Sequence, residues 1–173
     1  MIKRLITITA VAVVATMAIA ASAFALGVTG TVTGTAGLGL NQGSAPSFTA
    51  TLAGSDQTVT YQPGLAVTDA RGTGGGWHLT VSATSLTDGT HTLSQSVSAV
   101  SQACAGGSTC SLPTNSVTLP VAIGSTGSSF YSAASGAGLG IVNVNPTVSV
   151  AIPGNAYAGS YASTVTFAAV AGP

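Results

Sequence analysis

Charged residues are almost missing from this sequence of 173 residues. It contains three Lys or Arg and three Asp or Glu, and after position 25 the only base is Arg71. The acids are Asp56, Asp69 and Asp88. Nucleic-acid binding depends on Lys and Arg that neutralise phosphates, and anionic lipid surfaces attract clusters of the same residues. A single base therefore argues against both kinds of partner.

Long apolar runs and helical periodicity are also missing beyond residue 26. No later run approaches the roughly 20 residues that a membrane-spanning helix needs, so no membrane partner is expected for this part of the chain. Val and Thr are abundant, which argues against disorder. We expect Ser, Thr, Gly and Asn to provide a neutral polar surface.

Side chains suited to catalysis are few. The acid–base inventory beyond residue 25 amounts to His78, His91, the three Asp residues and four Tyr residues. Each Asp lies near turn-forming residues, where it is favoured for backbone hydrogen bonding. Both histidines are expected to be exposed and solvated. No Gly-x-Ser-x-Gly elbow occurs, and the glycine-rich residues 72–76 are not followed by the Gly-Lys-Ser/Thr of a phosphate loop.

The sequence therefore predicts a protein that is not an enzyme and needs no cofactor. A secreted hydrolase stays open as a remote alternative, because counting residues does not exclude a Ser-His-Asp arrangement.

The two cysteines, Cys104 and Cys110, flank a short glycine-rich stretch. In an exported protein such a pair predicts a disulfide. No cluster of His or further Cys accompanies them, so no metal site is expected.

The N-terminus has the pattern of a secretory signal peptide over residues 1–25. A basic start, Lys3-Arg4, precedes an apolar run that ends in Ala23-Phe-Ala25. Cleavage after Ala25 leaves residues 26–173 as one domain, with Ala23 as a second possible site. An uncleaved anchor over residues 5–26 is the alternative. Covalent wall attachment is not expected, because the only stretch that resembles a sortase signal, residues 112–115, lies in the middle of the chain.

Alternation with a period of two predicts an all-β fold, a single antiparallel β-sandwich or barrel-like domain. Residues 27–37 could be a first strand or a flexible lead-in. Glycine-rich residues 124–129 and 135–140 are expected to be loops, and residues 89–100 are less regular. The expected strands cover residues 47–52, 58–61, 65–69, 77–83, 117–123, 139–144, 148–152 and 163–170.

Two segments resemble the motifs of WxL-domain proteins. Residues 67–82 contain Asp69-Ala-Arg-Gly-Thr-Gly-Gly-Gly-Trp77-His-Leu79, which matches the first motif of that family. The C-terminus resembles the second motif at Tyr161, Thr166 and Pro173, whereas Val165, Phe167 and Ala169 replace Leu, Trp and Leu.

The resemblance implies a secreted β-rich domain on the cell surface that binds peptidoglycan, or another cell-wall glycan, without covalent linkage. It also implies association with other surface proteins. The residues proposed for glycan contact are Trp77, Leu79, Tyr157, Tyr161 and Phe167. Core packing is the competing explanation for Trp77, Leu79 and Phe167, and Tyr157 and Tyr161 are expected to be more exposed than Trp77.

A second hypothesis, from a different class, is a structural subunit of a surface filament or layer. Exposed strand edges of one copy would then pair with those of another, and the partner would be the protein itself.

Overall fold

The structure is a computed structural model that describes residues 30–34 and 37–173. The expected signal peptide, residues 1–25, lies outside the described residues. The described part of the chain contains ten strands, which are joined by turns and loops. Within these residues no helix is long and apolar enough to cross a membrane.

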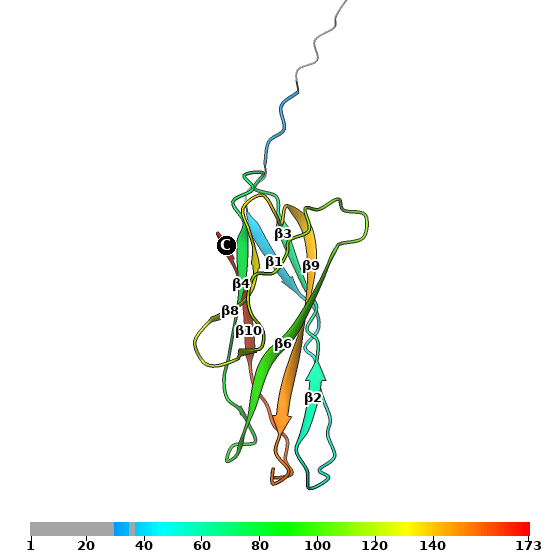
Figure 1. Cartoon of the computed structure of the whole chain (residues 1–173), viewed down its shortest axis with the longest axis vertical. Coiled ribbons are helices and arrows are strands. Elements are labelled where there is room, and N and C mark those ends of the chain that lie inside the picture. Colours follow the sequence, from blue (N-terminus) through cyan, green and yellow to red (C-terminus); the bar gives the residue numbers. More distant parts are fainter. Residues whose placement is uncertain (1–29, 35–36) are drawn as a thin grey trace, which may run out of the picture. The chain divides into compact units, whose positions relative to one another are not determined.

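The larger sheet is antiparallel, and β9 and β6 lie at its centre (Figure 1). Its strand order is β1 (Leu38–Gln42), β3 (Leu65–Asp69), β9 (Gly140–Ile152), β6 (Thr92–Cys104) and β5 (Leu86–Thr87). Two further strands complete it, with β2 (Gln57–Tyr61) pairing with β9 and β7 (Val121–Ala122) pairing with β6.

The smaller sheet has β4 (Trp77–Ala83) between β10 (Val165–Ala171) and β8 (Ser128–Ala133). All of its pairings are antiparallel as well. The register of β4 and β8 shifts between Leu79 and Thr80, so that Phe130 is an extra residue on β8. This bulge allows Phe130 and Tyr131, although adjacent in sequence, both to be buried.

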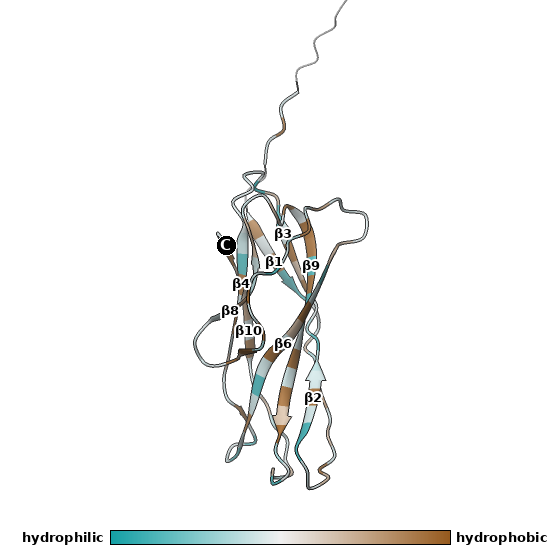
Figure 2. Ribbon diagram, in the orientation of Figure 1, coloured by the Kyte–Doolittle hydropathy of each residue, from teal (hydrophilic) through white to brown (hydrophobic). Residues whose placement is uncertain are grey.

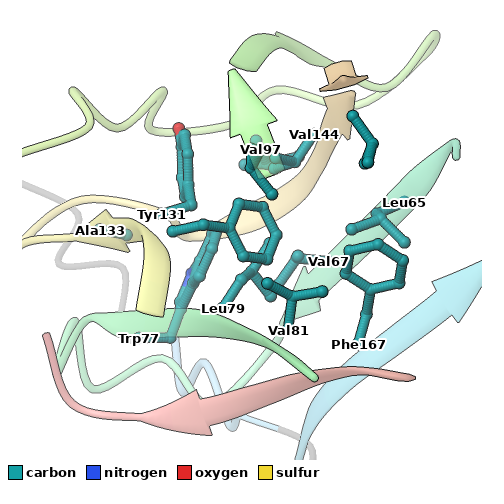
Figure 3. Packing of buried hydrophobic residues seen from close by; sticks show 13 residues of the cluster. Leu65, Val67, Trp77, Leu79, Val81, Val97, Tyr131, Ala133, Val144 and Phe167 are labelled. Atoms are coloured by element: carbon teal, nitrogen blue, oxygen red, sulfur yellow. The ribbon is translucent and has the colours of Figure 1, made fainter. Parts of the chain in front are cut away.

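Buried and less buried side chains alternate along the strands, which explains why the two sheets pack face to face. Along β9 every second residue from Val142 to Ile152 is buried, and brown segments alternate with paler ones along β9 and β6 in Figure 2. The side chains of both sheets meet in one core, to which β4 contributes Trp77, Leu79 and Val81 (Figure 3). The all-β, antiparallel prediction is confirmed. Strand β1 also contacts β10 and β7 contacts β8, which gives the two sheets a barrel-like closure at their edges.

Strands β2 and β3 behave as one long strand with a break in the middle. Tyr61 faces Val148 and Leu65 faces Val144, so the same register runs through both pairings with β9. At the break this register places Pro63 opposite Pro146. Neither proline has an N–H to donate, which explains why the ladder is interrupted there.

Several predicted strand boundaries are wrong. Residues 47–52 are extended but belong to no strand, although their alternation is regular. Residues 124–129 are not wholly a loop, because β8 begins at Ser128, and only Val121–Ala122 of the expected strand 117–123 pairs. The bulged β8 lacks clean alternation, which explains why the sequence pattern did not show it.

Other elements are longer than predicted. The strands expected at 139–144 and 148–152 are a single strand, β9, and the irregular residues 89–100 lie largely in β6. The first strand begins at Leu38, and residues 30–34 form none. Residues 27–29 and 35–36 lie outside the described residues. The predicted disulfide is confirmed, with the Cα atoms of Cys104 and Cys110 5.6 Å apart.

Candidate functional site

The first motif forms a loop that is held by a partly buried ion pair between Arg71 and Asp69. Arg71 donates from Nε and Nη2 to the two carboxylate oxygens of Asp69, over 2.9 and 2.8 Å, and from Nη2 to the carbonyl oxygen of Gly76 over 2.7 Å. The Asp69 side chain is buried. Hydrogen bonding from the Arg71 side chain holds the pKa of Asp69 below its usual value. This pair fixes where the loop ends and hence where Trp77 enters the core.

Trp77 is fully buried, and its indole N–H donates to the carbonyl oxygen of Gly138 over 3.0 Å. Its ring stacks on Tyr131 with the two centroids 5.6 Å apart. The hydroxyl oxygen of Tyr131 is buried and has no hydrogen-bond partner among the described residues, and burial raises the pKa of Tyr131 to about 12.

The two family motifs lie on adjacent strands. In the pairing of β4 with β10, Trp77 faces Ala171 and Val81 faces Phe167. Phe167 is only 7% exposed and meets Phe130 edge to face, with the ring centroids 5.8 Å apart. Trp77, Leu79 and Phe167 all point into the shared core (Figure 3). A polymer outside the folded domain therefore cannot reach Trp77 or Leu79, and packing explains both.

A cleft of about 1020 Å³, which we name the tip cleft, borders this core at Phe167. Its walls come from segments far apart in the sequence, namely the extended chain after β1, the β9–β10 loop and the inner faces of both sheets. The lining consists of residues 42–52 and 156–163 together with Tyr61, Pro63, Leu86, Leu93, Gln95, Ile152, Val165 and Phe167.

A chain of neutral hydrogen bonds crosses the floor of the tip cleft. The Tyr61 hydroxyl donates to the side-chain oxygen of Gln95 over 2.9 Å, and the Gln95 amide donates to the Ser163 hydroxyl over 3.3 Å. Gln95 is buried, and burial raises the pKa of Tyr61. Tyr61 therefore stays a protonated donor at neutral pH, and the floor carries no charge.

Tyr157 forms the exposed rim of the tip cleft. It is 63% exposed, and one face of its ring stacks on His91 with the centroids 3.8 Å apart. Asp88 holds this arrangement, since its carboxylate accepts hydrogen bonds from the backbone N–H groups of His91 and Thr90 and lies 3.0 Å from Nδ1 of His91. These contacts, led by the backbone N–H of His91, lower the pKa of Asp88 to about 2.

Tyr161, four residues after Tyr157, also lines the tip cleft and is half-buried. Its hydroxyl donates to the carbonyl oxygen of Tyr157 over 3.0 Å. Burial, and secondly the negative charge of Asp88, raise the pKa of Tyr161 above its usual value. The Tyr161 hydroxyl thus remains a donor, and its hydrogen bond links Tyr161 to the backbone of Tyr157.

The chemistry of the tip cleft is neutral. None of the described residues that line it is charged, and its walls combine aromatic and aliphatic side chains with hydroxyls and amides. Groups of three or more His, Cys, Asp or Glu that could hold a metal ion do not occur among residues 30–34 and 37–173. The cleft can bind an uncharged ligand by ring stacking and hydrogen bonding.

The structure brings together three of the residues singled out from the sequence. Tyr157, Tyr161 and Phe167 line the tip cleft, whereas Trp77 and Leu79 do not. The expectation that Tyr157 and Tyr161 are more exposed than Trp77 is confirmed. Tyr61 and Gln95 were not predicted from the sequence to belong to the site. The available signal was that each follows an exposed residue, Thr60 or Ser94, in an alternating segment and should therefore face inward.

The expected roles of the histidines and aspartates are partly wrong. Both histidines are half-buried, and His78 places Nδ1 2.7 Å from the carbonyl oxygen of Gly172. Asp88 has the expected turn role, and Asp69 bonds locally to Arg71. Asp56 instead accepts a hydrogen bond from the distant backbone N–H of Gly154 over 2.8 Å.

The described residues form an antiparallel β-domain whose tip cleft has an uncharged lining. The model of the family described as WxL domain, surface cell wall-binding, matches residues 29–173. The chain belongs to this family, whose members bind the cell wall at the cell surface. The family is a binding family rather than an enzyme family. No curated protein and no solved structure matches the chain.

Proposed function

We propose that this domain binds peptidoglycan without a covalent bond and contacts its sugar chain through the tip cleft. The observation that carries the proposal is the exposed ring of Tyr157, fixed by His91 at the rim of a cleft of about 1020 Å³. Known small-molecule sites occupy roughly 300–1,000 Å³. The cleft is therefore large enough for a short stretch of polymer.

The charge distribution favours the sugar chain over the stem peptides. The lining of the tip cleft is neutral, whereas stem peptides carry ionised carboxylates and amines. Burying an unpaired charge is costly, but a pyranose offers an apolar face and hydroxyls. The free face of Tyr157 suits stacking, and Ser160 and Gln42 supply hydrogen-bonding groups on the lining.

Sedimentation with purified sacculi tests this proposal. Sacculi stripped of protein and accessory polymers are mixed with residues 26–173, pelleted, and washed with denaturant. We expect the domain to pellet and to be released intact by denaturant, as a non-covalent complex requires. Walls whose stem peptides have been removed by an amidase should retain the domain. Binding that disappears after amidase treatment would contradict the choice of ligand.

Export is a separate part of the proposal. The pattern of residues 1–25 supports a secreted protein that is cleaved after Ala25 and held at the wall. Intact-mass measurement of the protein from the culture or wall fraction tests it. A mass that corresponds to residues 26–173 is expected, whereas a mass that includes residues 1–25 would favour the uncleaved anchor.

A further inference from the structure

Residues 44–52, which we name the strap, run beside β2 without joining the sheet. Among the described residues no backbone–backbone hydrogen bond involves the strap, and its one backbone contact with β2 is the bond from the Gln57 side-chain amide to the carbonyl oxygen of Thr51 over 3.0 Å. Backbone pairing ends at Gly43, whose N–H donates to the carbonyl oxygen of Gly64 over 2.8 Å. Strand β2 pairs with β9 on one side, and the described residues offer no strand on its other side. Two extended backbones with unused hydrogen-bonding groups thus border the same cleft.

The register of the neighbouring strands fixes how the strap would pair. Leu40 faces Val67 and Gln42 faces Leu65, and the Gly43–Gly64 bond continues the same register. Strand β3 continues into β2 without a change of register. Extended by the same rule, the register places Ser47 opposite Thr60 and Thr49 opposite Thr58.

Proline does not prevent this pairing. Hydrogen-bonded pairs alternate with non-hydrogen-bonded pairs along an antiparallel ladder. Because Gly43 and Gly64 form a hydrogen-bonded pair, the next hydrogen-bonded strap positions are Ala45, Ser47 and Thr49. Pro46 falls on a non-hydrogen-bonded position, so its missing N–H costs the ladder nothing.

The side chains of the strap also match β2. In this register Phe48 lies opposite Val59, on the half-buried face of β2. Phe48 already stacks on Tyr61, with the ring centroids 6.2 Å apart. Ser47 and Thr49 fall on the outer face, opposite the exposed Thr60 and Thr58. Such cross-strand pairs are those that stabilise antiparallel ladders.

We propose that the strap is a switch strand that pairs with the free edge of β2, and that this pairing competes with ligand binding in the tip cleft. The second part rests on the proposed function. The strap supplies one wall of the cleft. Pairing would bring that wall to within about 4.8 Å of β2, the spacing of neighbouring strands, and would take space from the cleft. The present structure is then the open form, and a ligand in the cleft favours it.

Amide hydrogen exchange on the unmodified protein tests the pairing without any ligand. The N–H groups of Ala45, Ser47 and Thr49 would point at β2, whereas those of Phe48 and Ala50 would point outward. We expect exchange at the first three positions to be slowed on the order of tenfold or more relative to the last two. Uniform, unprotected exchange along the strap would overturn the proposal. Protection that arises only at high protein concentration would also overturn it, because a second copy would then supply the strand.

A cysteine lock tests the coupling to ligand binding. Ala50 and Gln57 form a non-hydrogen-bonded pair in the proposed register, and such pairs bring Cβ atoms within about 4.5–5.5 Å. Ala50→Cys combined with Gln57→Cys should form a disulfide, whereas Ala50→Cys with Thr58→Cys, on opposite faces, should not. Peptide mapping identifies the bond.

We expect the variant in its oxidised, locked state to bind sacculi at least about fivefold more weakly than the same variant after reduction, which corresponds to about 1 kcal/mol. Equal binding in both redox states would reject the coupling but leave the exchange result standing. If the wild-type protein itself does not sediment with sacculi, the proposed function fails, and the exchange pattern still decides whether the switch strand exists.

Discussion

The indole N–H of Trp77 donates to the carbonyl oxygen of Gly138 across 3.0 Å, which joins the family's tryptophan to a glycine 61 residues later. Gly138 has a φ of +80°, and a Cβ at this position would overlap the Trp77 indole nitrogen. The bond satisfies the one polar atom of a fully buried ring. The tryptophan of the first motif therefore has a structural role that depends on glycine in the β8–β9 loop.

Gly138→Ala should destabilise the domain by about 2–4 kcal/mol, because the methyl group combines backbone strain with a clash in the core. The matched control is Gly136→Ala, since Gly136 also has a positive φ of +83° but has open space around it. We expect the control to lose only about 1 kcal/mol. Urea titrations measure both, and equal losses would contradict the role assigned to the contact with Trp77.

Tyr131→Phe should leave the domain as stable as before or stabilise it by about 1 kcal/mol, because it removes a buried hydroxyl that has no partner among the described residues. Tyr61→Phe is the opposite control. Its hydroxyl donates to Gln95, so its removal should cost about 1 kcal/mol. Thermal melts of the two variants compare them, and a clear loss for Tyr131→Phe would mean that its hydroxyl has a partner in solution.

Asp69→Asn should flatten the dependence of stability on acid pH. The pKa of Asp69 is lowered in the folded state, chiefly by the hydrogen bond from the Arg71 side chain. Its contribution to stability is therefore full above the unfolded pKa of about 3.9, and it is lost as the pH falls through the folded value. Melting temperatures from pH 7 to pH 2 should fall more steeply for the wild type than for the variant. Parallel curves would contradict the assignment.

Much of the fold follows from alternation in the sequence. Trp77, Leu79 and Val81 predicted β4 correctly, because every second residue of a half-buried strand faces the core. The same pattern failed at Phe48, because alternation shows which side chains face inward but not which backbone hydrogen bonds form. The bulge at Phe130 broke the alternation and concealed β8.

The site was harder to predict than the fold. Tyr157 and Tyr161 could be singled out as exposed aromatic residues because Gly and Ser flank them. Their surroundings were not found, because the tip cleft joins Gln95 and Tyr61 from the larger sheet to residues 156–163. Long-range register, which alternation does not specify, creates this meeting. The family motif itself marked core residues rather than the proposed contact surface.

Binding of the tip cleft to the wall is tested most directly by binding isotherms of residues 26–173 on purified sacculi for the wild type, Tyr157→Ala and Leu112→Ala. Leu112 is 49% exposed and does not line the tip cleft, so it controls for the loss of any exposed apolar side chain. We expect Tyr157→Ala to weaken binding by about fivefold to tenfold, the size of one lost ring contact of about 1–1.4 kcal/mol, and Leu112→Ala to bind like the wild type. Unchanged binding by a folded Tyr157→Ala variant would contradict binding through the tip cleft.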